Sequence, residues 1–166
     1  MSDPLGLLHP IVRSALQRHG VLYEVLACDP DLADTAAFCE HYGFALEQAA
    51  NTIVVASKKV DPPKYAVCVV LGTTRLDVNT KVSELLGVKR LSFADQETTM
   101  SLTGMLIGGV TPFGIDALPV YVDRAVTDQG QVVMGGGNRS SKLLIDPREL
   151  VKLPTASIVG DLARPS

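Results

Sequence analysis

The sequence predicts an α+β fold (mixed α/β) in which a largely antiparallel or mixed sheet is surrounded by helices. Three observations support this class. Helix-like and strand-like segments are interspersed, they lack the regular alternation of a βαβ protein, and short turns join several of the strand candidates. At 166 residues, with 46% hydrophobic and 20% charged residues, the chain is expected to form a single domain over residues 1–166.

The first part of the chain predicts two helices separated by a strand. Pro10 and Gly20 are typical start and stop residues of a first helix. A β-rich strand candidate follows at Val21 to Cys28. Asp34 can then cap a short helix expected over Thr35 to Tyr42.

An antiparallel hairpin is expected next. Its two β-rich runs are Thr52 to Ala56 and Lys64 to Leu71, and Asp61-Pro62-Pro63 between them predicts a loose connecting loop. Lys58 and Lys59 lie in the same hairpin beside Lys64. Solvated surface charge is the default interpretation of these lysines, and contact with a nucleic-acid backbone is the alternative.

The second half predicts further helices and short strands. A helix is expected after Asp77, with Gly87 as its end, and Ser92 with Asp95 resembles the capping box of a helix that runs to Thr103. Asp146-Pro147 starts a short helical segment. Four strands are expected, at Leu118 to Val122, Gln131 to Met134, Lys142 to Ile145 and Thr155 to Val159.

The segment from Thr103 to Gly114 is the main candidate for a functional loop. Met105 to Ile107 reads as a short buried strand, and Gly108-Gly109 followed by Pro112 predicts a turn with exposed backbone N–H groups. Successive N–H groups aimed at one point can hold an oxyanion and stabilise developing negative charge. Taken alone, the pattern also fits an ordinary turn.

Two other stretches offer polar groups for a ligand. Gly135-Gly136-Gly137 with Asn138 and Arg139 can present N–H groups and a guanidinium to a phosphate, although a flexible hairpin loop is equally consistent with it. Asp123 ends a strand candidate, where it can orient a site residue or pair with Arg124 or water.

Composition narrows the class of function. The net charge of −3 argues against a protein that binds duplex nucleic acid, DNA included, and leaves a short single-stranded end open. Hydrolase nucleophile motifs are absent, and the isolated histidines and the unpaired spacing of Cys28, Cys39 and Cys68 predict neither a metal site nor a disulfide framework. No cofactor is expected. Without a secretory signal or a convincing membrane span, the expected location is the cytoplasm.

Several segments together resemble the YbaK/ProX family of free-standing aminoacyl-tRNA deacylases, which is related to the editing domain of bacterial prolyl-tRNA synthetases. The likeness covers nearly the whole chain, and its most specific part is the Thr-Gly, Gly-Gly-x-x-Pro and Asp spacing. The segments that carry it are His9 to Leu16, Thr35 to Ala37, Asn51 to Val55, Leu76 to Gly87, Thr103 to Gly114, Leu118 to Asp123 and Gly135 to Arg139.

The resemblance implies a curved, barrel-like sheet and a reaction. The reaction is hydrolysis of the ester that links a wrong amino acid to the 3′-terminal adenosine of a tRNA, with the tRNA's own ribose hydroxyl orienting the attacking water. It also implies a catalytic role for Gly108, Gly109, Val110, Thr111, Pro112 and Asn51. Substrate binding is implied for Thr35, Thr52, Asp123, Gly137, Asn138 and Arg139.

Asn51 departs from the family pattern, in which a lysine usually precedes the threonine found here as Thr52. An amide makes only neutral hydrogen bonds, which are weaker than those of an ammonium group. Either another cation replaces the lysine, with Lys58, Lys64, Arg139 and Lys142 as candidates, or deacylation is lost.

Three hypotheses therefore stay open. The first is a trans-editing enzyme, for which Gly109→Val is expected to abolish turnover with the fold intact. The second is a non-catalytic module that binds tRNA ends or an aminoacyl-tRNA synthetase. The third is a small-molecule hydrolase or binding protein that reuses the same pocket.

Overall fold

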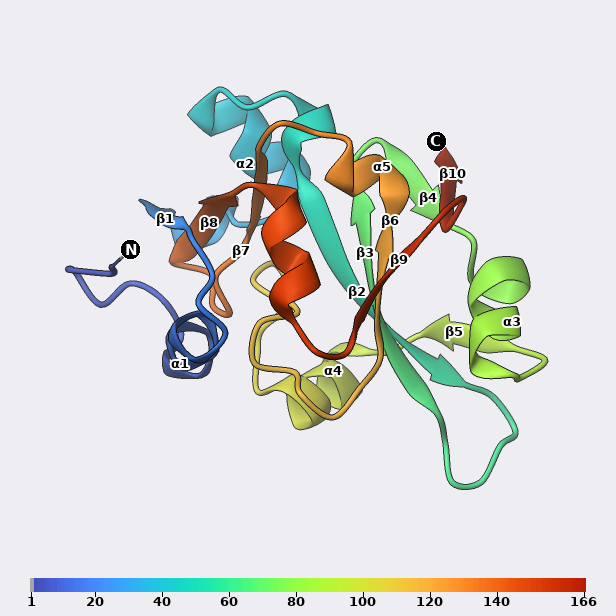
Figure 1. Cartoon of the computed structure of the whole chain (residues 1–166). Helices are drawn as coiled ribbons and strands as arrows, with labels where there is room; N and C mark the ends of the chain where they lie inside the picture. The colour runs from blue at the N-terminus through green and yellow to red at the C-terminus, as the bar shows by residue number, and fades with distance from the viewer. Residues whose placement is uncertain (1) are drawn as a thin grey trace.

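The structure, a computed structural model, describes residues 2–166 and has the expected mixed α+β architecture. Its α-helices are α1 (Pro10–Arg18), α2 (Thr35–Tyr42), α3 (Ser83–Leu86), α4 (Gln96–Thr103) and α5 (Arg124–Thr127). Shorter helical turns are η1 (Pro30–Leu32), η2 (Leu46–Gln48), η3 (Val78–Val82) and η4 (Pro147–Lys152). Figure 1 shows these helices distributed around the strands.

The strands form one larger sheet and two smaller ones. The largest sheet has the order β5 (Leu91–Phe93), β2 (Ala50–Ser57), β3 (Tyr65–Leu71), β6 (Val120–Asp123) and β9 (Ala156–Val159). The second sheet has the order β1 (Glu24–Ala27), β8 (Ser141–Ile145) and β7 (Val132–Gly135). In the third, β10 (Ala163–Pro165) pairs with β4 (Thr74–Leu76).

Most of the strand pairs are antiparallel, as expected. The predicted hairpin is confirmed, because β2 pairs antiparallel with β3 from Ala50 opposite Leu71 to Ala56 opposite Tyr65. Only β3 with β6 and β6 with β9 are parallel pairs of named strands in residues 2–166. The largest sheet is open, with β5 and β9 at its edges, so the barrel-like closure is not confirmed.

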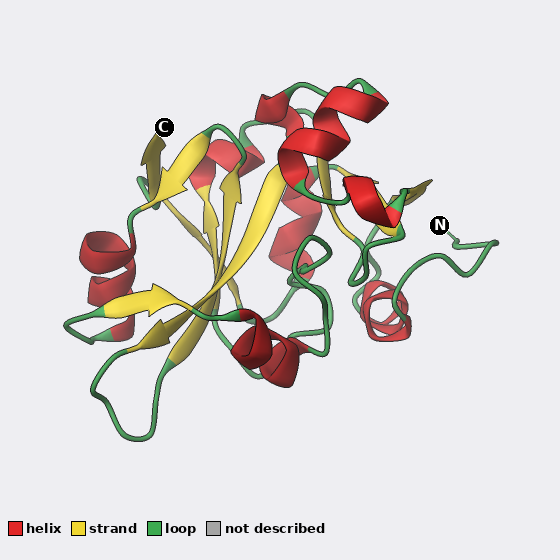
Figure 2. Cartoon of the chain, turned by 180° about the vertical axis from the view of Figure 1, so that it is seen from behind, coloured by secondary structure: helices red, strands yellow, loops and turns green. Residues whose placement is uncertain are grey.

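The two larger sheets meet near the middle of the molecule. Ala49, just before β2, forms an isolated parallel bridge with Val133 of β7. In Figures 1 and 2, α2 lies above this junction, and the loop that follows α4 lies below it. The junction therefore brings together segments that are far apart in the sequence.

Apolar residues of α1 and of the central strands build the core. Val12, Ala15 and Leu16 are fully buried on one face of α1, in agreement with the helical spacing. Strand β3 is buried along nearly its whole length, because both of its faces are covered. The sheet is thus a stable support for the segments at its ends.

Some boundaries differ from the expected ones. Met105 to Ile107 is not a strand, and Leu106 and Ile107 are 40% and 45% exposed. Ser92 lies in β5, and Asp95 alone caps α4 by accepting a hydrogen bond from the Thr98 N–H at 2.7 Å. The short elements β4, β5, β10 and α5 were not predicted. No helix in residues 2–166 is long and apolar enough to cross a membrane.

Candidate functional site

A cavity of about 430 Å³ opens at the junction of the two larger sheets. Its lining comes from α2, β2, β5, β7 and β8, from α4 and from the loop after α4. Polar groups and apolar side chains share the wall, as is usual for a site that binds a small group. The lining residues used below are Asp34, Thr35, Phe38, Cys39, Asn51, Thr52, Phe93, Ile107, Gly108, Val110, Gly135 and Lys142.

Lys142 is the only charged side chain in this wall that is buried. It belongs to β8 and pairs with Gly135 of β7, so its side chain starts from the sheet rather than from a flexible loop. Its Nζ atom donates hydrogen bonds to the Ala33 carbonyl at 2.6 Å and to the Gly108 carbonyl at 2.7 Å. An ammonium group carries three N–H donors, so one remains for a ligand in the cavity.

The charge of Lys142 is not neutralised by an ion pair among residues 2–166. Its Nζ atom lies 5.4 Å from the centroid of the Phe38 ring, which gives a weak cation–π attraction. Burial lowers the pKa of Lys142 from its usual value. A buried cation held by carbonyls alone is costly, and such groups are concentrated at functional sites.

Two of the predicted site residues form a hydrogen bond in the cavity wall. The Thr35 hydroxyl, at the start of α2, donates to Asn51 Oδ1 of β2 at 2.5 Å. The Thr52 hydroxyl oxygen is buried and has no hydrogen-bond partner within residues 2–166. The amide N–H groups of Asn51 therefore remain available to a ligand, whereas the Thr52 hydroxyl oxygen is buried behind the wall.

The glycine-rich loop, within Thr103 to Gly114, has only some of its N–H groups free of internal hydrogen bonds. Gly108 and Val110 line the cavity, and within the described residues their N–H groups donate no hydrogen bond. The Gly109 N–H is already used, because it donates to the Leu106 carbonyl at 2.9 Å. Thr111 is fully buried and lies outside the lining. Two residues of this loop thus line the cavity together with Lys142, and their N–H groups have no acceptor within the described residues.

The glycine run at residues 135–137 packs against the glycine-rich loop and supports it. Gly137 N–H donates to the Gly109 carbonyl at 2.7 Å. A Cβ atom at Gly109 would lie 2.0 Å from the Asn138 carbonyl oxygen, and one at Gly135 would lie 2.4 Å from the Gly109 carbonyl oxygen. The glycines are therefore required for close approach of two backbone segments. This arrangement is tightly packed, unlike the flexible loop considered from the sequence.

Asn138 has a structural position. Its side-chain amide donates to the Leu7 carbonyl at 2.9 Å, and its Oδ1 atom accepts hydrogen bonds from the Ser140 N–H and the Ser141 hydroxyl. These bonds hold the turn between β7 and β8 and link it to the segment before α1. The structure does not bring it to the cavity wall.

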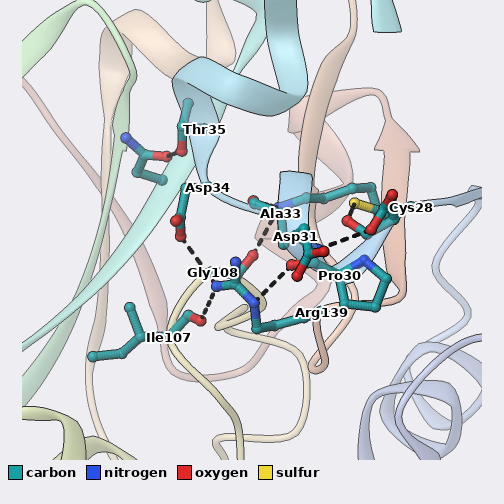
Figure 3. A network of polar contacts seen from close by, with 12 residues as sticks. Cys28, Pro30, Asp31, Ala33, Asp34, Thr35, Ile107, Gly108 and Arg139 are labelled. Carbon is teal, nitrogen blue, oxygen red and sulfur yellow. Dashed lines mark hydrogen bonds and ion pairs between the residues drawn. The ribbon is translucent and has the colours of Figure 1, made fainter. Parts of the chain in front are cut away.

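Arg139 links three segments beside the cavity (Figure 3). Its Nε atom donates to the Pro30 carbonyl at 3.0 Å, and Nη1 donates to the Ile107 carbonyl at 2.9 Å and to Asp34 Oδ1 at 3.1 Å. Asp34 therefore binds Arg139, and its side chain makes no capping hydrogen bond to α2. The guanidinium holds η1, the start of α2 and the glycine-rich loop together.

Replacing Arg139 with methionine is expected to loosen these segments. The change removes three hydrogen bonds, one of them to the exposed Asp34 carboxylate, and should lower the free energy of unfolding by about 1–3 kcal/mol. Hydrogen exchange should become faster in the segment around Ile107. Unchanged exchange there would show that the loop is held by other contacts.

Asp123 lies outside the cavity, at the end of β6. It is 3% exposed, and its carboxylate accepts a hydrogen bond from the Leu162 N–H at 3.3 Å. Burial raises its pKa, while hydrogen bonds from backbone N–H groups oppose that effect. Its contacts support a structural role in place of the expected role in substrate binding.

The other two cations considered for the site, Lys58 and Lys64, are exposed and lie away from this wall. Gly137 and Pro112 are also outside the lining. Gly137 packs against α1, where a Cβ atom would lie 2.5 Å from the Cβ of His9. Of the four cations named from the sequence, Lys142 alone reaches the cavity, although its sequence context gave no sign of burial.

A cysteine nucleophile is not favoured, because burial disfavours the reactive thiolate. Cys39 lines the cavity, and burial raises the pKa of its thiol, which keeps it protonated near neutral pH. Burial also raises the pKa of Cys28. Among residues 2–166, no group of three or more His, Cys, Asp or Glu side chains is placed to hold a metal ion.

The fold and the cavity define a small α+β domain whose pocket is lined by the glycine-rich loop, a buried lysine and several polar side chains. The family model described as "Aminoacyl-tRNA editing domain" matches residues 29–153. The chain belongs to this family, and the resemblance noted in its sequence is confirmed.

Solved structures share the fold over almost the whole chain. The hypothetical protein APE2540 is 25% identical, with a TM-score of 0.81 over 93% of this chain and 99% of its own. A protein described as a candidate trans-editing enzyme for prolyl tRNA synthetase is 26% identical, with a TM-score of 0.78 over 96% of this chain and 99% of its own. A computationally designed epitope scaffold, 24% identical, matches with a TM-score of 0.77 over 96% of this chain and 100% of its own.

Proposed function

We propose that this chain is a trans-editing hydrolase that cleaves the ester between a wrong amino acid and the 3′ end of a tRNA. Membership of the editing-domain family and the similarity to the candidate trans-editing enzyme support this role. One observation carries the catalytic part of the proposal. The Lys142 ammonium group lies in the cavity wall and holds the Gly108 carbonyl, so a cation and the glycine-rich loop act at the same place.

The reaction needs a water molecule and a place for negative charge. The water oxygen forms a bond to the ester carbonyl carbon, and the carbonyl oxygen becomes an oxyanion. The carbon–oxygen bond to the ribose then breaks, and the proton lost by the water ends on the ribose oxygen. Oriented donors at the oxyanion lower the barrier to this step without a covalent intermediate.

The donors for this oxyanion are the free N–H groups of Gly108 and Val110 together with the third N–H of Lys142. The first two belong to a loop whose backbone is held by the hydrogen bond from the Gly137 N–H to the Gly109 carbonyl. Lys142 adds a full positive charge, which is stronger than a neutral donor in a buried site. It thereby offsets the absence of a lysine at Asn51.

Asn51, Thr35 and Thr52 then serve to bind the substrate. The Thr35 hydroxyl fixes the Asn51 side chain through Oδ1, which leaves the amide N–H groups to donate to the amino acid or to the terminal ribose. Thr52 lines the cavity next to Asn51 and is assigned to shaping the pocket around the substrate. Binding in a second pocket of this kind adds selectivity that a synthetase pocket cannot reach for side chains differing by one methylene, worth about 1–3 kcal/mol.

A non-catalytic module that binds tRNA ends or an aminoacyl-tRNA synthetase is the second candidate. It is motivated by Asn51, which cannot supply the charge of the usual lysine. In that case the cavity would hold the aminoacyl end without hydrolysing it. For either role we propose a cytoplasmic location, where aminoacyl-tRNA is used.

The test is release of amino acid from a panel of mischarged tRNAs that includes alanyl, seryl, threonyl and cysteinyl esters. Wild type is expected to deacylate at least one of them selectively. Asn51→Ala should lower the rate on that ester by about fivefold, since a neutral hydrogen bond contributes about 1 kcal/mol. Asn51→Lys should give no increase, because Lys142 already provides the cation.

Two results would contradict the proposal. Tight binding of aminoacyl-tRNA by wild type with no release from any ester would favour the non-catalytic module. A gain of hydrolysis in Asn51→Lys alone would show that Lys142 does not replace the missing lysine.

A further inference from the structure

A group of basic side chains lies outside the cavity, at the far end of β2 and β5. We call Lys58, Lys64, Lys89 and Arg90 the basic cluster. The Lys58 N–H donates to the Arg90 carbonyl at 3.0 Å, which places the end of β2 beside the start of β5. Lys58, Lys89 and Arg90 line a common hollow of about 480 Å³.

Lys64 joins the same group from the neighbouring strand. Its carbonyl accepts a hydrogen bond from the Ser57 N–H at 2.8 Å, and its Nζ atom donates to the Leu86 carbonyl at 3.3 Å. Leu86 ends α3, so Lys64 connects the hairpin to the segment that carries Lys89. The cluster is thus formed by two segments held in fixed positions.

The charge of the cluster is not neutralised within the protein. All four side chains are exposed, and none of them takes part in an ion pair among residues 2–166. This is notable in a chain with a net charge of −3. Unpaired cations gathered around a hollow fit a phosphate backbone, which binds mainly by charge.

Strand β5 connects the basic cluster to the cavity. Arg90 directly precedes β5, and Phe93 at its other end lines the cavity while remaining 58% exposed. Three residues of extended chain span about 10 Å, which is the scale of a few nucleotides at about 3.4 Å each along a strand. Figure 1 shows the β2–β3 loop, β5 and α4 together in the lower part of the molecule.

We propose that the basic cluster binds the phosphates of an RNA acceptor end and that β5 directs this end to the cavity, with Phe93 stacking on a base near its mouth. Aromatic side chains between cationic groups are typical of surfaces that bind single-stranded nucleic acid. This inference rests on the proposed function, because it adds the binding surface for the tRNA from which the ester is cleaved. It also explains how an acidic protein can hold RNA, through a local concentration of positive charge.

The experiment compares wild type with the triple variant Lys58→Gln, Lys89→Gln, Arg90→Gln. Binding of an uncharged acceptor-stem RNA hairpin with a single-stranded 3′ end is measured at several salt concentrations. The triple variant should bind at least about tenfold more weakly. The slope of log K against log salt should fall in magnitude by about 2, since each lost phosphate contact contributes about 0.7–0.9.

Hydrolysis is measured on two substrates, aminoacylated RNA and aminoacyl-adenosine, of which the second carries no phosphates. The triple variant should have a raised KM on aminoacylated RNA. Its rate on aminoacyl-adenosine should be unchanged, because the cavity is intact. A matched control removes the same charge from three exposed arginines on other elements, Arg18→Gln, Arg75→Gln and Arg148→Gln. The control should bind RNA as wild type does.

The two proposals fail in different ways. Three outcomes would each overturn the role of the basic cluster. RNA affinity and salt slope could be equal in wild type and the triple variant, the control could lose as much affinity as the triple variant, or wild type could fail to bind RNA. RNA binding that depends on the cluster, with no ester hydrolysis by wild type, would support the cluster and contradict the proposed hydrolase.

Discussion

Replacing Lys142 with methionine is expected to lower kcat for deacylation by about 10²–10³-fold with little change in KM. Methionine fills a similar volume, whereas it removes the donor that the proposal places at the oxyanion. The Gly108 and Ala33 carbonyls also lose their hydrogen bonds to Nζ, so the loop loses part of its support. Single-turnover hydrolysis at saturating enzyme measures the chemical step.

Lys152→Met is the matched control for this variant. Lys152 also donates to a backbone carbonyl, that of Gly20 at 2.9 Å, and lies outside the cavity lining. Its loss should leave kcat unchanged. Equal kcat in wild type and Lys142→Met would remove Lys142 from the reaction, and a shared loss in both variants would indicate a general effect on the fold.

The pH profile gives an independent test of Lys142. Burial lowers its pKa below the usual 10.5. Only the protonated side chain carries the charge and the third N–H, so catalysis should be complete below the lowered pKa and decline as pH rises through it. The alkaline decline, measured after subtraction of spontaneous ester hydrolysis, should therefore begin below pH 10.5 and should be absent in the residual activity of Lys142→Met.

The sequence was sufficient to predict most of the framework. Pro10 and Gly20 bound α1, and the β-rich runs on either side of Asp61-Pro62-Pro63 form β2 and β3 as expected. These signals are local, since they depend on propensities and turn residues within a few positions. The short elements β4, β5 and β10 were missed, because three-residue strands are defined mainly by their partners.

The site was predicted only in part, for a physical reason. Thr35, Asn51, Thr52, Gly108 and Val110 meet in the cavity. Burial of Lys142 depends on how β8 is placed beside α2 and the glycine-rich loop, which no local pattern of a strand lysine can reveal.

The glycine run at residues 135–137 illustrates the same limit. A run of three glycines fits a flexible loop or a phosphate site equally well when only the sequence is known. In the structure Gly135 and Gly136 are buried, and added Cβ atoms would meet neighbouring atoms at 2.4 Å and 2.1 Å. The neighbour of Gly135 is the backbone of Gly109, so Gly135 is needed by a segment more than twenty residues away, whereas the neighbour of Gly136 is the Ser141 hydroxyl oxygen.

This close approach changes the expected effect of substitution at Gly109. Gly109→Val was expected from the sequence to stop turnover and leave the fold intact. A Cβ atom at this position would lie 2.0 Å from the Asn138 carbonyl oxygen and 2.5 Å from the Asn138 carbonyl carbon. Backbone atoms cannot rotate away as a side chain can, so one of the two segments must move.

Even Gly109→Ala is therefore expected to lower the free energy of unfolding by at least about 3 kcal/mol, at the upper end of the cost of overpacking. Deacylation should also be lost, because a shift of about 1 Å in the N–H groups of Gly108 and Val110 costs roughly 10²-fold in rate. Chemical denaturation and ester hydrolysis on the same preparation measure both effects.

Gly130→Ala provides the control, since a Cβ atom there would have no neighbour within 4 Å. It should change the free energy of unfolding by no more than about 1 kcal/mol and leave hydrolysis unaffected. If Gly109→Ala were as stable as wild type but inactive, the contact with the Asn138 backbone would not limit stability, and Gly109 would matter only for the position of the loop's N–H groups. If it were both stable and active, the contact between the glycine-rich loop and the Asn138 backbone would not be needed to position the loop's N–H groups.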